Sequence, residues 1–218
     1  MAFNSQIRIR PELIAHVETK VIPMYSKFDD GHNVQHVRDV LEKSHMIGSS
    51  IEELVDPNIV YTVAAYHDVG RSIDVYAHEK YSAIMLLDDE KIKQWFSESE
   101  MEIMAQAIID HRASSDHEPK SIYGKIVADG DRKLDFNTYM RRTVQFNLHQ
   151  FPNLTKKEYF EKVIEHMREK YGRGGYIKLW LNYKDDVEKL AQITERVEGP
   201  VDMLRRDFSI DYEIEIAE

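Results

Sequence analysis

The chain has 218 residues, 42% of them hydrophobic and 31% charged, a composition typical of a globular protein long enough to bury a core within a single domain. The absence of cysteine excludes disulfides, thiolate metal sites and a cysteine nucleophile, so any bound metal must use histidine or oxygen ligands. The formal net charge of -10 argues against a nucleic-acid polymer as partner, because a protein that neutralises many phosphates needs a basic surface.

The first half of the chain is predicted to be helical. Its N-terminus lacks the apolar core of a signal peptide, and no apolar run approaches the ~20 residues of a membrane span, so we expect a cytoplasmic protein without a membrane partner. Asp56-Pro57 and Ser97 with Glu100 are typical helix starts. Apolar residues at helical spacing predict helices over residues 11–28, with a kink at Pro23, and over 32–46, 57–67, 77–87, 98–111 and a segment in which Ile122, Ile126 and Asp129 share one face.

The second half of the chain continues the helical pattern up to its last residues. Helices are predicted over residues 138–148, 156–171 and 176–197. In the tail, Ile210, Tyr212, Ile214 and Ile216 alternate with acidic residues, which is the period of a strand, so the tail is interpreted as an extended edge segment or a loose end. We expect one domain over 1–218, with a core at about 25–140, a helical extension at about 141–208 and an extended acidic tail at 209–218.

The pair His67-Asp68 ends the predicted helix that starts at Pro57. Val60, Val63, Ala64 and His67 share a helical face, so His67 is expected to point towards the core. An ionised carboxylate at the inner end of an apolar helix costs several kcal/mol unless it is paired, hydrogen-bonded or bound to a metal. Asp68 therefore requires partners from elsewhere in the chain.

Two further residues on separate predicted helices offer metal-binding side chains. His36 lies in the second helix, and Asp129 lies on an inward face of the helix that contains Ile126. A single histidine on an apolar face is more often a core residue with one hydrogen bond. Two imidazoles and two carboxylates from separate helices are better explained by a divalent ion that they enclose.

The order of these residues resembles the HD domain superfamily of metal-dependent phosphohydrolases. The resemblance rests on three segments, HVRDV at 36–40, HDVGR at 67–71 and ADGDR at 128–132, and covers roughly residues 25 to 140. It implies an all-α helical bundle with additional C-terminal helices. It also implies that the metal ligands are His36, His67, Asp68 and Asp129. His32 competes with His36 for the first position and Asp131 with Asp129 for the last, where helical phase favours Asp129.

Two more histidines stand where many HD proteins also have histidines, namely His78 and His111. In members with two metals such residues hold the second ion, and in members with one they can line the substrate site. We therefore place both with Asp68 in the catalytic set. The simpler interpretation is that each is a surface or helix-capping histidine, since a charged histidine suits a helix C-terminus.

The ligand types indicate which metal and which substrate to expect. Histidine with carboxylate suits manganese, iron, cobalt, nickel or zinc better than magnesium, so we expect one such ion, with a second possible. Two ligating carboxylates cancel the charge of the ion, so a phosphate group needs further cations. Arg71 is the first choice for binding substrate, and His32, Arg132 and Lys133 follow; the last two are more simply explained as a solvated helix end.

These expectations define a function and its alternatives. The resemblance implies a hydrolase that cleaves a small phosphorylated molecule, such as a nucleotide, by attack of a metal-activated water on phosphorus. A dinuclear-iron oxygenase is the alternative that His78 and His111 motivate. A non-catalytic module that retains its metal is the third alternative. The sequence does not define the oligomeric state.

Overall fold

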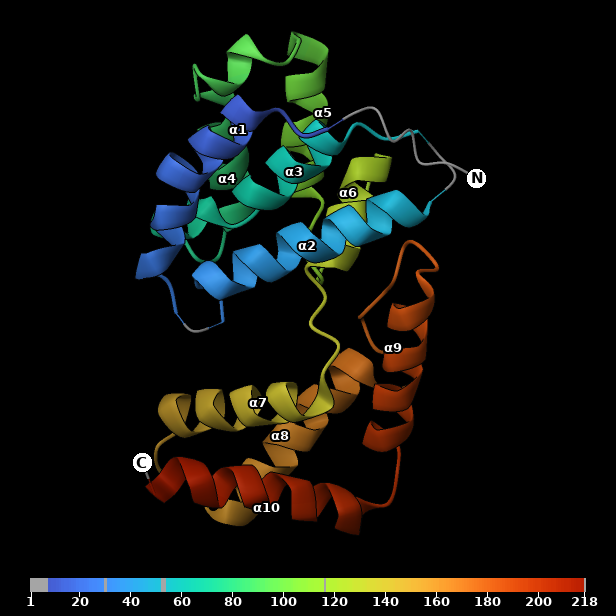
Figure 1. Ribbon diagram of the computed structural model, residues 1–218. Coiled ribbons are helices and arrows are strands. Elements are labelled where there is room, and N and C mark those ends of the chain that lie inside the picture. Colours follow the sequence, from blue (N-terminus) through green and yellow to red (C-terminus); the bar gives the residue numbers. More distant parts are fainter. Residues whose placement is uncertain (1–7, 30, 52–53, 116, 218) are drawn as a thin grey trace. The chain divides into compact units, whose positions relative to one another are not determined.

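The computed structural model describes residues 8–29, 31–51, 54–115 and 117–217 (Figure 1). These residues form helices and no strand, which confirms the all-α class predicted from the sequence. The chain divides into two compact units, Met1–Arg132 and Lys133–Glu218. Within the described residues, no helix combines the length and the apolar composition needed to cross a membrane.

The first unit contains six α-helices and four short helical segments of other kinds in its described part. In chain order they are α1 (Pro11–His16), η1 (Val17–Val21), η2 (Ile22–Lys27), α2 (Val34–Ser50), α3 (Pro57–Tyr66), η3 (Val69–Ser72), α4 (His78–Leu87), η4 (Ile92–Gln94), α5 (Glu98–Ile109) and α6 (Ile122–Gly130). The predicted helix starts at Asp56-Pro57 and at Ser97 are confirmed, because Asp56 accepts a hydrogen bond from Asn58 N and Ser97 forms a capping box with Glu100.

The helix predicted over residues 11–28 with a kink at Pro23 consists of three segments of different helical type. A short α-helix is followed by a π-helical turn and then by the 3-10 segment η2, in which Pro23 lies near the start. Proline has no N–H to donate, so an α-helix cannot run through this position without losing a hydrogen bond. The change of helix type places Tyr25 with its side chain fully buried.

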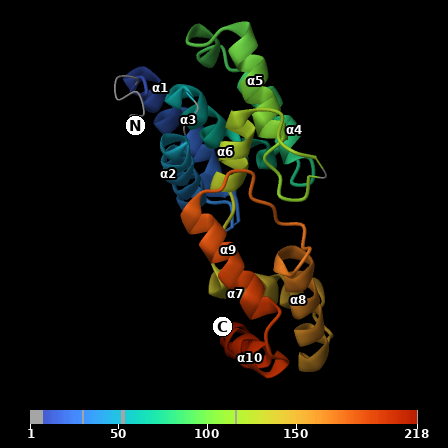
Figure 2. The ribbon, with the colours of Figure 1, turned by 90° about the vertical axis from the view of Figure 1, so that its right-hand side faces the viewer.

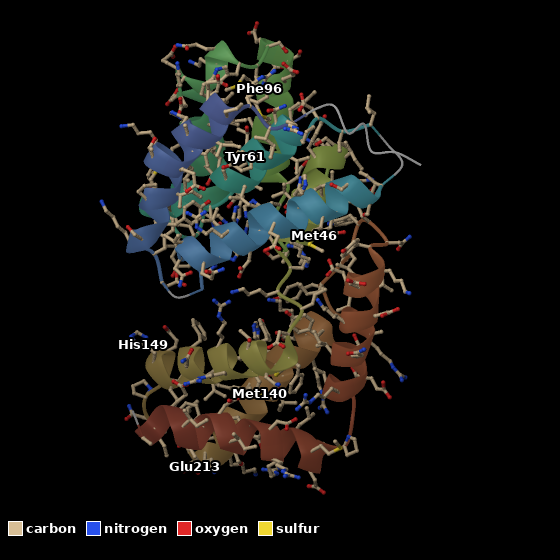
Figure 3. The ribbon with its side chains drawn as sticks, in the orientation of Figure 1. Met46, Tyr61, Phe96, Met140, His149 and Glu213 are labelled. Atoms are coloured by element: carbon tan, nitrogen blue, oxygen red, sulfur yellow. The ribbon has the colours of Figure 1, made fainter. Side chains whose placement is uncertain are left out.

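Helix α3 lies at the centre of the first unit. It contacts α2, α5 and α6 along its length, and nearly all of its residues are buried (Figure 1, Figure 2). A helix that is apolar on all sides is stable only when neighbours cover every face. Phe96, labelled in Figure 3, belongs to the same hydrophobic core. The core thus fixes the end of α3, where His67 and Asp68 follow.

The second unit consists of α7 (Phe136–Gln150), α8 (Lys156–Tyr171), α9 (Lys184–Val197) and α10 (Val201–Ala217). It has a hydrophobic core of its own, in which Met140 of α7 is fully buried (Figure 3). The sequence was interpreted as one domain with a core at about 25–140 and a helical extension at about 141–208, and the boundary between the two units follows Arg132. Helical periodicity shows which face of a helix is buried, but not which helices share a core.

Two predicted elements of the second unit are wrong. Residues 176–183 are not helical, because the chain turns back at Gly174, whose φ is 83°, and Tyr176 N then donates to the carbonyl of Glu169. The tail is helical up to Ala217 rather than extended, while Glu218 lies outside the described residues. The core of the second unit is contacted by three tail residues at a spacing of four, Leu204, Phe208 and Tyr212. This spacing places them on one face of a helix, and their packing favours the helix over the strand that the alternating pattern predicted.

Candidate metal centre

His67 and Asp68 follow directly after the last residue of α3. His67 is 0% exposed and Asp68 3% exposed, so the expectation that this pair is buried holds. Nδ1 of His67 lies 2.7 Å from the carbonyl oxygen of Ala64. Because a carbonyl only accepts, Nδ1 carries the proton, and the lone pair of Nε2 points away from the helix. Asp68 leaves the helix with φ -116° and ψ 0°.

A first group of donor atoms forms around His36, His67 and Asp68. One atom of each lies within 4.8 Å of the others. Nε2 of His36 is 3.2 Å from Nε2 of His67 and 3.7 Å from Oδ2 of Asp68. The carboxylate of Asp131 adds a fourth donor, because its Oδ1 lies 3.3 Å from Nε2 of His36 and 3.8 Å from Nε2 of His67.

A second group of donors uses the other oxygen of Asp68. Oδ1 of Asp68 lies 3.1 Å from Nε2 of His78 and 3.7 Å from Nε2 of His111, and these two nitrogens are 3.4 Å apart. Nδ1 of each histidine faces a backbone carbonyl, that of Val75 for His78 and that of Ile108 for His111. Both rings therefore also turn an Nε2 lone pair towards Asp68. Asp68 is the residue that the two groups share.

The charges in the first group depend strongly on burial. Burial lowers the pKa of His36, but the contacts with Asp131 and Asp68 outweigh it and raise this pKa to about 9. Burial lowers the pKa of His67 to about 4, so this imidazole is neutral. For Asp68 burial raises the pKa, but the imidazoles of His67, His111 and His36 outweigh it, and the pKa lies well below its usual range.

The donor set therefore fits a divalent ion. Two imidazole nitrogens with two ionised carboxylates suit transition metals, and the ion would neutralise the negative charges of Asp68 and Asp131. Ligating histidines normally donate their other ring N–H to a partner, as His67 does. Nδ1 of His36 is an exception, since it is buried and has no hydrogen-bond partner among the described residues.

Asp129, which helical phase favours as the fourth ligand, and its alternative Asp131 lie on either side of the end of α6. Asp129 lies within α6 and is fully buried, and its backbone carbonyl accepts a hydrogen bond from Arg132 N. The carboxylate of Asp131, just beyond the last helical residue Gly130, lies beside both imidazoles. The helix ends between the two aspartates, so its phase does not predict the direction of Asp131.

His32 and Arg71, the two residues predicted to bind substrate, both contact the carboxylate of Asp29, which the sequence did not identify. Oδ1 of Asp29 lies 2.8 Å from Nδ1 of His32, and its Oδ2 accepts from Nη2 of Arg71 at 3.1 Å. The ring of His32 stands 5.6 Å from the ring of His36. His32 is thus engaged by Asp29, while His36 faces His67. The sequence does not show that Asp29 lies beside Arg71, because these two residues are 42 positions apart.

Arg132 is buried rather than solvated, contrary to the simpler interpretation of its position. It is 5% exposed, and its Nη1 donates to the backbone carbonyl of His111 at 3.2 Å. Nη1 also lies 3.9 Å from Oδ2 of Asp131. Arg132 therefore supports the segment that carries His111. Lys133 belongs to the second unit, where its carbonyl accepts from the hydroxyl of Tyr171.

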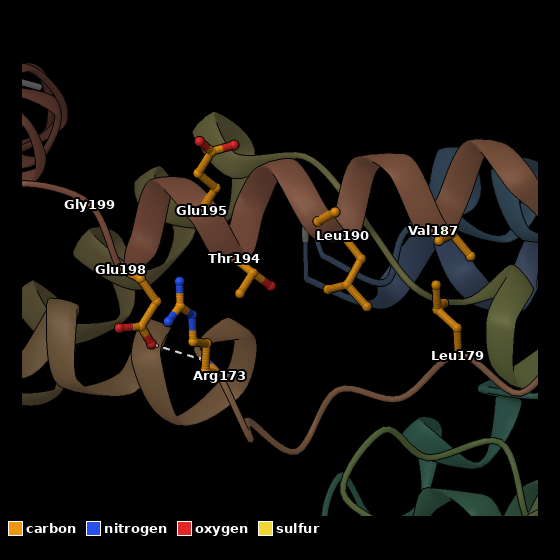
Figure 4. Close-up of a pocket in the computed structure, with 9 residues that line it drawn as sticks. Arg173, Leu179, Val187, Leu190, Thr194, Glu195, Glu198 and Gly199 are labelled. Carbon is orange, nitrogen blue, oxygen red and sulfur yellow. Dashed lines mark hydrogen bonds between the residues drawn. The ribbon is translucent and has the colours of Figure 1, made fainter.

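The second unit has a groove with a cavity volume of about 850 Å³ (Figure 4). Its apolar wall comes from α9 and the preceding loop, and at one end Glu198 accepts a hydrogen bond from the backbone N–H of Arg173 (Figure 4). None of the residues predicted for the site line this groove. The chemistry implied by the histidines therefore belongs to the first unit.

Comparison with known proteins agrees with this location. A family model described as HD domain matches residues 33–134. The matched span contains both donor groups, from His36 to Asp131. No curated protein and no solved structure matches the chain.

Proposed function

This chain belongs to the HD domain family through residues 33–134, and on that premise we propose that it is a divalent-metal-dependent phosphohydrolase. The proposed substrate is a small phosphorylated molecule, with nucleotides as the first class to test. The observation that carries the proposal is the meeting of two buried donor groups at Asp68. Such a concentration of ionised carboxylates and imidazoles in a core is costly without a cation.

The proposed ligands of the primary ion are His36, His67, Asp68 and Asp131. We propose Asp131 rather than Asp129 because the carboxylate of Asp131 lies against both imidazoles. The mixed nitrogen and oxygen donors favour manganese, iron, cobalt, nickel or zinc over magnesium. When bound, a divalent ion lowers the pKa of a water ligand from about 15.7 towards 7 and polarises a phosphoryl oxygen.

The remaining residues have roles that do not depend on the identity of the ion. His78 and His111 are proposed to accept or hold a proton at Nε2, next to Oδ1 of Asp68, or to hold a second ion there. Arg71 is proposed to bind the phosphate, because Asp68 and Asp131 cancel the charge of one divalent ion. Asp29 orients the guanidinium of Arg71, with His32 on the other oxygen of the same carboxylate.

A dinuclear-iron oxygenase is a second candidate function. The observation in its favour is the second donor group, Asp68 with His78 and His111, which offers a complete set of atoms for another ion. The shared carboxylate would then lie between two metals. A hydrolase can also use two ions, so the geometry of the donors does not separate the two functions.

One experiment separates these functions. The purified protein is analysed for its metals, and the metal-free protein is then supplied with manganese, cobalt or iron and assayed over nucleoside mono-, di- and triphosphates. Phosphate release that depends on the metal supports the hydrolase. Two irons per chain, oxygen consumption and no phosphate release would replace it with the oxygenase.

A further inference from the structure

A tyrosine outside the family match contacts the backbone on both sides of His67. Tyr25 lies in η2 and is 0% exposed. Its hydroxyl donates to the carbonyl oxygen of Ala65 at 2.9 Å and accepts from the backbone N–H of Asp68 at 3.2 Å. One phenol oxygen thus joins the last turn of α3 to the residue that both donor groups share.

The backbone at this point needs such a partner. Past the last turn of a helix, carbonyl and N–H groups lose their intrahelical partners, and when buried they require others. Asp68 has left the helix, with φ -116° and ψ 0°. The hydroxyl of Tyr25 supplies one of these partners.

Neighbouring rings hold the side chain of Tyr25 in place. Its ring packs edge-on against Phe28, with centroids 5.4 Å apart, and stands 6.1 Å from the ring of His67. A phenol hydroxyl carries its proton at neutral pH and is both donor and acceptor.

We propose that Tyr25 is a positioning residue of the metal centre, whose hydroxyl fixes the backbone of Asp68. The orientation of Asp68 decides whether its Oδ2 faces His36 and its Oδ1 faces His78. This inference rests on the proposed metal site and goes beyond it, because Tyr25 is not a ligand and precedes the span that the family model matches.

Tyr25→Phe tests the role of the hydroxyl, and Tyr66→Phe is its matched control. Tyr66 is also buried, directly precedes His67, and donates its hydroxyl to Oδ2 of Asp89 at 2.6 Å rather than to the backbone at Asp68. Tyr25→Phe loses two hydrogen bonds and Tyr66→Phe loses one, so both variants should unfold at a lower temperature than the wild type. Only Tyr25→Phe should alter metal binding.

The measurement is a titration of the metal-free proteins with Co²⁺, followed by the visible absorption of the bound ion. We expect Tyr25→Phe to weaken Co²⁺ binding by roughly 10- to 100-fold, the range for residues that orient ligands, and to change the absorption spectrum. Tyr66→Phe should keep the affinity and the spectrum of the wild type. If Tyr25→Phe also kept the Co²⁺ affinity and the absorption spectrum of the wild type, the role of Tyr25 would be overturned.

Two other outcomes are equally decisive. If the wild type binds no Co²⁺, the proposed metal site is itself overturned, and the inference about Tyr25 with it. If Tyr25→Phe does not fold, a variant with 4-aminophenylalanine at residue 25 replaces it. The amino group of this side chain can still donate to the carbonyl oxygen of Ala65, but it is a weaker acceptor for the backbone N–H of Asp68. The Co²⁺ affinity of this variant must then fall below that of the wild type, and an unchanged affinity would overturn the inference.

Discussion

Oδ1 of Asp68 lies 3.1 Å from Nε2 of His78, while Oδ2 of the same carboxylate lies 3.6 Å from Nε2 of His67. A single aspartate therefore divides its oxygens between two groups of histidines. Loss of His78 removes a donor from one group, whereas loss of Asp68 removes a donor from both.

The fourth ligand can be identified by comparing two aspartates. Asp131→Asn should weaken the binding of the primary ion, because the carboxylate beside His36 and His67 loses its charge. Asp129→Asn should lower the stability of the first unit and leave metal affinity largely unchanged. Equilibrium titration of both metal-free variants with Co²⁺ distinguishes them, and the reverse pattern would restore Asp129 as the ligand.

Metal binding should release a proton and should strengthen as the pH rises. The pKa of His36 is about 9 in the metal-free protein, since its contacts with Asp131 and Asp68 outweigh burial. At neutral pH the imidazole therefore carries a proton that the ion must displace, and affinity should rise by about tenfold per pH unit until the pH reaches this pKa. His67 is already neutral and contributes no such proton.

Calorimetric titration in buffers of different ionisation enthalpy counts the released protons. Near pH 7 the expected value is close to one per primary ion, and it should decline as the pH passes the pKa of His36. An affinity that is independent of pH over this range would show that His36 is not a ligand or is not protonated.

Gly70 permits a close approach between η3 and the start of α4. A Cβ at this position would lie 2.3 Å from the carbonyl oxygen of His78 and 2.4 Å from Ser82 N. Both are backbone atoms, so Gly70→Ala should push His78 away from Asp68. We expect a loss of stability of about 1–3 kcal/mol, as for other overpacked sites, and weaker binding of any second ion.

Gly48→Ala is the control for Gly70→Ala. A Cβ at Gly48 meets its neighbours at 3.7 Å or more, which is ordinary contact, and the residue lies inside α2. Alanine there should stabilise the protein by roughly 0.5–1 kcal/mol through its higher helix propensity. Chemical denaturation and metal stoichiometry of the two variants check both expectations. A Gly70→Ala variant with the stability and metal stoichiometry of the wild type would show that the close approach of η3 to α4 does not require glycine at this position.

Arg71→Ala should impair the binding of phosphorylated substrate without loss of metal. The guanidinium pairs with Asp29 and not with the proposed ligands, so the donor groups should persist. We expect a higher KM for any substrate found, with the metal content of the wild type. Arg38→Ala removes a comparable pair with Glu18 at an exposed position and serves as the control. Unchanged kinetics in Arg71→Ala would exclude it from the site.

The local parts of the fold and site were predictable from the sequence. The helix starts at Asp56 and Ser97 follow from capping chemistry, which acts within a few residues. His36, His67 and Asp68 were identified by motif and by apolar periodicity, and the structure brings them together. In each case the informative residues lie on one helix or directly beside it.

The parts that failed depend on contacts between distant residues. The direction of Asp131 could not be predicted from helical phase, because α6 ends before it. The pairing of Asp29 with Arg71 links separate elements and leaves no local pattern. The helical tail depends on Phe208 packing against the core of the second unit. Periodicity describes a single segment, whereas these features depend on which segments meet.

The central claim is that Asp68 holds the metal on which phosphate hydrolysis depends. The most direct measurement is phosphate release by metal-free wild type and by Asp68→Asn, each before and after addition of manganese, with bound metal determined in the same samples. The account predicts release only from the wild type with metal, and little bound metal in Asp68→Asn. Phosphate release without metal, or full metal occupancy in Asp68→Asn, would contradict it.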